Sequence, residues 1–303
     1  MSLELGNARS VTKICARNAP LGNGAVLFND RGALEVLPWE IDMRRIAVVT
    51  GASSGIGRSF ATRLALEGMD LVAIARRADR LDVLKRELEV NGIRVQTIVA
   101  DLSDKGELRR VIEELSSMQV EMLVNSAGLA HYMPFARLPA ELARQLVDVN
   151  VVAPLLLTRA AIPGMIERGT GSIINIASLL AFSGAAREQH LPQRTVYAAT
   201  KAFLVTFTEI LAAEVEGTGV RVQVVCPGVV RSEFHSRQGL DMSQVPRMEP
   251  DQIVAASLSD LARGIVVSIP AMPDATAKVR LDEAAASLLR VARTSELPSR
   301  YDP

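Results

Sequence analysis

Residues 46–57 read Ile46-Ala-Val-Val-Thr50-Gly51-Ala-Ser-Ser-Gly55-Ile56-Gly57. The first five are apolar or β-branched, which is typical of a buried parallel strand. The glycines that follow allow a tight turn and let backbone N–H groups approach a ligand closely. A helical pattern continues to Glu67, and the N-terminus of a helix attracts anions. The stretch therefore predicts a strand–turn–helix unit that binds the phosphates of a nucleotide.

The alternation of strand and helix continues to about residue 270. Short apolar runs predict strands at 46–50, 71–75, 95–100, 122–125, 172–177, 220–226 and 264–269. Helical patterns lie at 56–67, 78–90, 107–116, 140–168 and 196–216. Such alternation with short links indicates right-handed βαβ units. The expected fold is α/β: a single doubly wound, Rossmann-type domain whose parallel sheet has helices on both faces.

Three regions are expected along the chain. Residues 1–43 lack the pattern and are interpreted as a poorly ordered N-terminal extension; a transit peptide is the alternative. Residues 44–273 form the Rossmann-type domain, and 274–303 a C-terminal helix and tail. The long links 179–194 and 229–250 follow strands at their carboxyl ends, where open sheets bind ligands. They are candidate substrate loops, or else ordinary surface loops.

Composition excludes several classes of function. The 303 residues hold 34 Lys+Arg and 34 Asp+Glu, so the net charge is zero, and we expect no nucleic-acid or membrane partner. No uninterrupted apolar run is long enough to span a bilayer, and no secretory signal begins the chain. Two cysteines and three scattered histidines predict neither a disulfide framework nor a metal site. A cytoplasmic protein follows by elimination.

The spacing Gly-x-x-x-Gly-x-Gly resembles the Thr-Gly-x-x-x-Gly-Ile-Gly turn of the classical short-chain dehydrogenase/reductases (SDRs). Further motifs match that family in its order: Asp101-Leu102, Asn125-Ser-Ala-Gly128, Asn150, Ser178, Tyr197-Ala-Ala-Thr-Lys201 and Pro227-Gly228. They extend over roughly residues 44–270. One departure is Ser126, which stands where the family carries a second asparagine.

The resemblance implies hydride transfer between a nicotinamide and a carbonyl or secondary alcohol carbon. Tyr197 would be the general acid/base, and Lys201, one helical turn on, would favour its phenolate. Ser178 would donate a hydrogen bond to the carbonyl oxygen. Asn150 would hold a water in a proton relay. The link that follows Ser178 is longer than usual in the family, so Ser183 is the alternative to Ser178.

The cofactor is expected to be NADP(H), with NAD(H) possible. Arg76 and Arg77 follow the second strand, where NAD users generally carry an acid, and a guanidinium can bind a 2′-phosphate in a fork. The alternative is that both arginines are solvated surface charges. The other candidate cofactor-binding residues are Thr50, Gly51, Ser53, Ser54, Gly55, Ile56, Gly57, Asp101, Leu102, Asn125, Ala127, Gly128, Tyr197, Lys201, Pro227, Gly228, Val230 and Ser232.

The substrate is expected to be a small, mainly apolar molecule. A reductase of a carrier-bound 3-ketoacyl group is the alternative, for which Arg231, Arg237 and Arg247 would supply a basic patch. A non-catalytic nucleotide sensor is a third possibility, and the presence of both Tyr197 and Lys201 disfavours it. By resemblance, the helices carrying Asn150 and Tyr197 form subunit contacts in a homodimer or homotetramer.

Overall fold

The structure is a computed structural model that describes residues 24–28, 34–38, 45–186 and 191–291. The chain divides into two compact units, Met1–Arg44 and Arg45–Pro303. In the first, β1 (Gly24–Phe28) pairs antiparallel with β2 (Leu34–Pro38), which the sequence did not predict. The rest of the predicted N-terminal extension and the tail at 292–303 lie outside the described residues.

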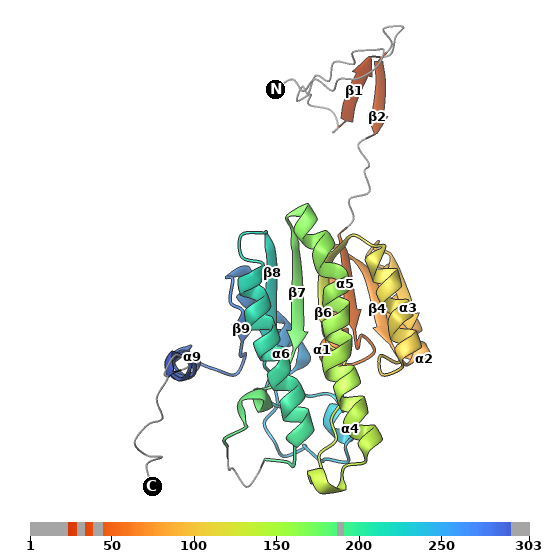
Figure 1. The fold of residues 1–303 in the computed structure, drawn as a ribbon. Helices are drawn as coiled ribbons and strands as arrows, with labels where there is room; N and C mark the ends of the chain where they lie inside the picture. The colour runs from red at the N-terminus through yellow and green to blue at the C-terminus, as the bar shows by residue number, and fades with distance from the viewer. Residues whose placement is uncertain (1–23, 29–33, 39–44, 187–190, 292–303) are drawn as a thin grey trace, which may run out of the picture. The chain divides into compact units, whose positions relative to one another are not determined.

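The second unit contains a seven-stranded parallel sheet (Figure 1) with the strand order β5-β4-β3-β6-β7-β8-β9. Its strands are β3 (Ile46–Thr50), β4 (Asp70–Ala75), β5 (Val95–Val99), β6 (Val120–Asn125), β7 (Gly171–Ile176), β8 (Val220–Val225) and β9 (Val267–Ser268). This is the predicted doubly wound arrangement. The strand order reverses between β3 and β6, and the carboxyl edge of an open sheet at such a reversal is where ligands bind.

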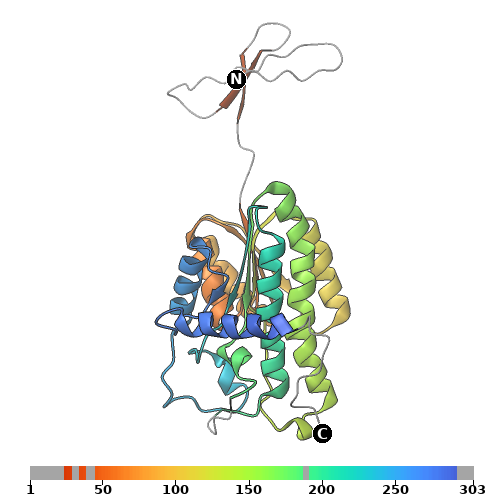
Figure 2. The same ribbon diagram turned by 60° about the vertical axis from the view of Figure 1, so that its left-hand side comes forward.

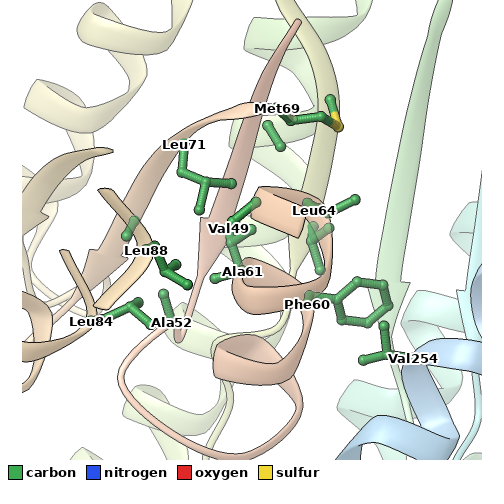
Figure 3. Packing of buried hydrophobic residues seen from close by; sticks show 14 of the residues in the cluster. Val49, Ala52, Phe60, Ala61, Leu64, Met69, Leu71, Leu84, Leu88 and Val254 are labelled. Carbon is green, nitrogen blue, oxygen red and sulfur yellow. The ribbon is translucent and has the colours of Figure 1, made fainter. Parts of the chain in front are cut away.

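Helices cover both faces of the sheet (Figures 1 and 2). One hydrophobic cluster joins α1 (Gly55–Leu66), α2 (Ala78–Glu89) and α8 (Pro250–Ala262) to the sheet, and Figure 3 shows its centre around Phe60 and Leu64. The other joins α3 (Lys105–Ser116), α5 (Ala153–Arg168) and the end of α6 (Thr195–Glu214). On β3, Ala47 and Val49 belong to the first cluster and Val48 to the second. Both faces are therefore buried, which explains the unbroken apolar strand.

The helix predicted over 140–168 is interrupted. It consists of α4 (Ala140–Val147), a π-helical turn at Asp148–Val152 and α5. Single π turns inside α-helices occur frequently at functional sites, and this one carries Asn150. The remaining described helices are two short 3-10 turns at Phe135–Arg137 and Leu179–Phe182, α7 (Glu233–Ser236), and α9 (Thr276–Arg290).

Two helical stretches, Ala140–Arg168 and Thr195–Glu214, are long and apolar enough to cross a membrane by length and composition alone. In this fold both belong to the layers that cover the sheet. Seven residues of α5 are buried, among them Leu157 and Met165, and α6 buries six. Packing within the fold therefore accounts for the apolar residues on the buried sides of these helices.

A series of hydrogen-bonded, buried polar side chains on β6 and β7 links α5 to α6, which cover the same face of the sheet. Asn125 Nδ2 donates to Thr158 Oγ1 (3.2 Å) and to Asn175 Oδ1 (2.9 Å). Asn175 Nδ2 donates to Thr208 Oγ1 (2.9 Å), which in turn donates to Leu204 O (2.6 Å). Buried amides without partners are costly. These bonds therefore hold the carboxyl ends of β6 and β7 in a fixed relation to α6.

We expect Thr208→Val to lower the free energy of unfolding by about 1–3 kcal/mol, because it preserves shape and leaves the buried Asn175 amide without its acceptor. Urea titration followed by circular dichroism measures this. Thr206→Val, an exposed position on the same helix, is the matched control and should change stability little. Equal effects at the two positions would contradict the prediction.

Candidate active site

The turn after β3 is shaped as a cradle that only glycine permits. Gly51 has φ 69°, and a Cβ on it would lie 2.9 Å from Ala127 N. A Cβ on Gly57 would lie 2.5 Å from Gly51 O, and one on Gly55 3.2 Å from Ser232 Cβ. The turn leads directly into the N-terminus of α1, where Ser54 is the N-cap. These residues fit a nucleotide pyrophosphate, which needs close backbone N–H groups and a helix N-terminus.

Thr50 joins the two strands at the reversal of the sheet. Its buried Oγ1 accepts the N–H groups of Ser126 and Ala127, both at 3.0 Å. The hydroxyl donates to Val124 O at 3.4 Å. Thr50 therefore positions the segment that follows β6 through its hydroxyl.

The two arginines after β4 have different partners. Arg76 Nη1 lies 3.5 Å from Asp101 Oδ2, and its side chain is 54% exposed. Arg77 Nη2 donates to Ser53 Oγ (3.0 Å) on the glycine turn, and Nη1 donates to Glu233 Oε2 (2.9 Å). Arg77 thus spans from the turn to α7, and neither arginine is simply a solvated charge.

Asp101 stands at the end of β5 with a depressed pKa. Partial burial raises the pKa, but hydrogen bonds from the Ser103 N–H (2.9 Å) and hydroxyl (2.7 Å) outweigh it, and the charge of Arg76 adds to them. The carboxylate is therefore ionised and held in one orientation. Leu102 beside it is buried in the core.

The other candidate cofactor residues lie at the same edge of the sheet. Ser232 is the N-cap of α7, with Oγ accepting the Phe234 N–H at 3.3 Å. Pro227 O accepts the Leu179 N–H at 2.9 Å, and Val230 is bridged to Met248. Ile56 packs against the core, and Asn125 belongs to the series of buried polar side chains. Gly128 adjoins Lys201, and Gly228 adjoins Leu179.

Tyr197, on the first turn of α6, is buried among aromatic rings. Its ring centroid lies 5.5 Å from that of Tyr132, edge to face, and 5.9 Å from that of Phe234. Burial raises the pKa of Tyr197 well above its usual range. A hydrogen bond with Tyr132 raises it further, whereas one with Ser178 lowers it. The pKa of Tyr132 is raised to about 12 by burial, in spite of the hydrogen bond with Tyr197.

Lys201 is buried one helical turn after Tyr197. Its Nζ donates to Ile176 O at 2.8 Å and lies 5.8 Å from the centre of the Tyr197 ring. Burial lowers the pKa of Lys201 to about 8, so most molecules carry this charge at neutral pH. A carbonyl at the end of β7 thus orients an ammonium beneath Tyr197.

The side chain of Asn150 is fully engaged within the protein. Oδ1 accepts the Leu129 N–H (3.1 Å), and Nδ2 donates to Leu129 O (2.9 Å) and to Thr200 Oγ1 (3.1 Å). Thr200 Oγ1 donates to Tyr197 O (2.7 Å). The residue therefore positions the segment after Gly128 against α6. Thr200 was not among the sequence-based candidates, although it directly precedes Lys201.

Ser178 and Ser183 have different surroundings. Ser178 caps the 3-10 turn at Leu179–Phe182, accepting the Leu180 N–H at 3.2 Å, and is the serine that lowers the pKa of Tyr197. Ser183 Oγ donates to Leu180 O (2.7 Å) and accepts from Arg194 Nε (2.7 Å). The Ser183 hydroxyl thus acts both as a donor and as an acceptor in holding the link before α6 in place.

Comparison with known proteins agrees with this geometry. Residues 45–242 match the family model for short chain dehydrogenases. The chain belongs to the short-chain dehydrogenase/reductase family. It is therefore an NAD(P)-dependent oxidoreductase with a Rossmann fold. A short chain dehydrogenase of Pseudocercospora fijiensis is 39% identical over 194 residues, which cover 63% of this chain and 61% of that relative. The chain thus spans less than two thirds of this relative's length.

Two solved SDR structures resemble the whole domain. A short-chain dehydrogenase from Sphingobium yanoikuyae, in complex with NADPH, is 35% identical with a TM-score of 0.80, covering 85% of this chain and 99% of its own. The bulky-bulky ketone specific alcohol dehydrogenase from Comamonas testosteroni is 32% identical with a TM-score of 0.76, covering 86% and 99% respectively.

The tyrosines of this SDR allow a test of the site that needs no substrate. The chain has three, and two of them, Tyr132 and Tyr197, have raised pKa values. We expect the ultraviolet absorbance of tyrosinate to show no more than one ionised tyrosine in the folded protein up to about pH 10.5, and about two equivalents or more at that pH in the unfolded chain.

The same shifts predict how stability depends on pH. The contribution of the two tyrosines is fully present below the unfolded pKa of about 10 and is lost as the pH rises toward the folded values. Circular dichroism at each pH confirms that the protein is still folded during the titration. Two tyrosine equivalents ionising near pH 10 in the folded state would show that the pocket is wetter than the structure describes.

Proposed function

We propose that this protein transfers a hydride between NADP(H) and the carbonyl or secondary alcohol carbon of a bulky, mainly apolar substrate. The observation that carries the proposal is the buried Tyr197–Lys201 pair beside Ser178, at the carboxyl edge of the sheet that also presents the glycine turn.

The residues that would hold the cofactor follow from the cradle. The turn from Gly51 to Gly57 would hold the pyrophosphate, Asp101 the adenine side, and Arg76 and Arg77 a 2′-phosphate. Bound in this way, the cofactor would supply the hydride or accept it. The Sphingobium neighbour, described with NADPH, supports the choice of NADP(H).

Tyr197 is proposed to exchange the proton at the substrate oxygen. Burial alone disfavours its phenolate, so the nearby Lys201 ammonium must stabilise the charge that develops on Tyr197. The single Oγ–H of Ser178 would donate to the substrate carbonyl oxygen. Asn150 acts as a positioning residue, because its side chain holds Leu129 and Thr200 in place.

An apolar wall favours a bulky substrate. Leu138, Leu180 and Phe234 pack around Tyr197 together with Tyr132. Aromatic and aliphatic walls with a few polar groups are typical of sites for apolar ligands. The Comamonas neighbour, whose name specifies bulky ketones, supports this substrate class.

A carrier-bound substrate is less well supported. It would need free basic side chains near the pocket to attract an acidic carrier. Arg231 Nε instead pairs with Glu249 Oε1 at 2.5 Å, and Arg237 pairs with Glu233. Arg231 is thus paired with a carboxylate of the same segment, and Arg237 is held by one that it shares with Arg77 and Arg80.

The test is NADPH oxidation with a panel of bulky aryl and alkyl ketones, alongside a 3-oxoacyl thioester. Tyr197→Phe should lower kcat/KM by at least about 100-fold, because the proton donor is lost, and should still bind NADPH. Fluorescence titration of NADPH measures the binding. Full turnover by Tyr197→Phe would refute the assigned role, and reduction of the thioester alone would favour the carrier-bound alternative.

Serine variants provide a matched pair for the same assay. Ser178→Ala should lower kcat by about 100-fold, by removing the donor at the developing oxyanion. Ser183→Ala should retain most of the activity, since the Ser183 hydroxyl bonds to Leu180 and Arg194 among the described residues. The reverse order would assign the role to Ser183.

We also propose a homodimer or homotetramer that forms through α6. The outer side of this helix has an apolar groove of about 260 Å³ lined by Phe203, Thr206, Phe207, Ile210, Leu211 and Glu214. Phe203 and Phe207 stack with their centroids 5.6 Å apart, and Ile210 is 57% exposed. Contiguous apolar surface of this kind marks association sites, and a second copy of α6 would cover it.

Ile210→Glu should shift the protein to monomer mass in size-exclusion chromatography with light scattering, because it places a charge in the groove. Leu66→Glu, at an exposed leucine on α1, should leave the mass unchanged. A monomeric wild type would overturn this proposal without affecting the catalytic one.

A further inference from the structure

Glu233, the first residue of α7, binds three arginines. Its carboxylate accepts from Arg77 Nη1 (2.9 Å), and it also accepts from Arg80 and from Arg237. Arg77 and Arg80 lie at the start of α2, more than 150 residues away in the chain. One carboxylate thus ties the segment after β8 to the segment after β4.

The cluster carries an excess of positive charge. Hydrogen bonds from Arg80 above all, and from Arg77 and Arg237, lower the pKa of Glu233 to about 2, so it is ionised under any working condition. Three guanidinium groups nevertheless share this one anion. A phosphate monoester carries nearly two negative charges and three acceptor oxygens. It therefore matches the charge of several guanidinium groups better than the single charge of a carboxylate does.

The cluster also adjoins the glycine turn. Besides Glu233, Arg77 binds Ser53, with Nη2 at 3.0 Å from Oγ and 3.5 Å from the carbonyl oxygen. Because Ser53 belongs to the turn that would hold the pyrophosphate, Arg77 joins the Glu233 cluster to the place where the cofactor is proposed to bind.

We propose that Glu233 is an internal competitor for the 2′-phosphate of NADP(H): its carboxylate occupies Arg77 and Arg80, and the bound phosphate takes these guanidinium groups from it. This inference rests on the proposed use of NADP(H). No covalent bond changes; one set of ion pairs replaces another.

Displacement of Glu233 has a consequence for the substrate side. Glu233 is flanked by Ser232, which lies against the glycine turn, and by Phe234, whose ring lies 5.9 Å from that of Tyr197. Releasing α7 from α2 therefore frees Phe234, which forms part of the apolar wall around Tyr197. A cofactor that lacks the 2′-phosphate would leave the ion pairs between Glu233 and the arginines of α2 in place.

The test is calorimetric binding of 2′,5′-ADP and of 5′-AMP, which differ in the 2′-phosphate. Glu233→Gln should bind 2′,5′-ADP about three- to tenfold more tightly than wild type, with 5′-AMP unchanged, because the competing charge is gone. The gain should shrink as salt is raised. Glu87→Gln, which removes a carboxylate from the pair with Arg58 on α1 and α2, is the matched control and should show no gain.

Weaker binding of 2′,5′-ADP by Glu233→Gln, or an equal change for both nucleotides, would overturn the competition. If wild type does not discriminate between the nucleotides but Glu233→Gln prefers 2′,5′-ADP, the competition stands and the proposed NADP(H) preference of the native protein fails. If neither protein discriminates, both fail. Thermal unfolding of the variant checks that it is folded, as expected for a side chain 39% exposed.

Discussion

The hydroxyl of Thr50 is the contact on which the geometry of the site depends. It accepts two successive N–H groups, those of Ser126 and Ala127, and so fastens the end of β3 to the segment after β6, at the point where the sheet reverses its strand order. Gly51 can then pass so close that no side chain fits between the two backbones. This approach brings the backbone of the turn against the segment after β6, next to the N-terminus of α1, where a phosphate would bind.

The same segment connects the cofactor side to the catalytic side. A Cβ on Gly128 would lie 3.4 Å from both Asn150 Oδ1 and Lys201 Nζ, and Asn150 holds Leu129 through both its carbonyl and its N–H. Close-packed interiors transmit small displacements. The turn, the π-helical residue and the buried lysine therefore form one continuous scaffold, in which Asn150 positions the segment after Gly128.

The fold could be predicted because its signals are local. Each strand is a short apolar run, and each run lies within three residues of an observed strand. The helix α8 was not predicted, although Glu249, Pro250 and Gln252 supply a capping box and a proline at the first turn. The π turn at Asp148–Val152 contains no glycine or proline and has no side-chain cap, so nothing in the sequence indicated a break in the helix predicted over 140–168.

The candidate site could be predicted only as far as its motifs extend. Tyr197, Lys201 and the glycine turn are marked by spacing, whereas the ion pair between Arg77 and Glu233 joins residues 156 positions apart, and spacing says nothing of it. The affinity for a phosphate then depends on the difference in free energy between two states. In one the arginines are paired with Glu233, and in the other they are paired with the phosphate. An arginine motif therefore identifies where a phosphate can bind, and the carboxylate already bound there determines how strongly.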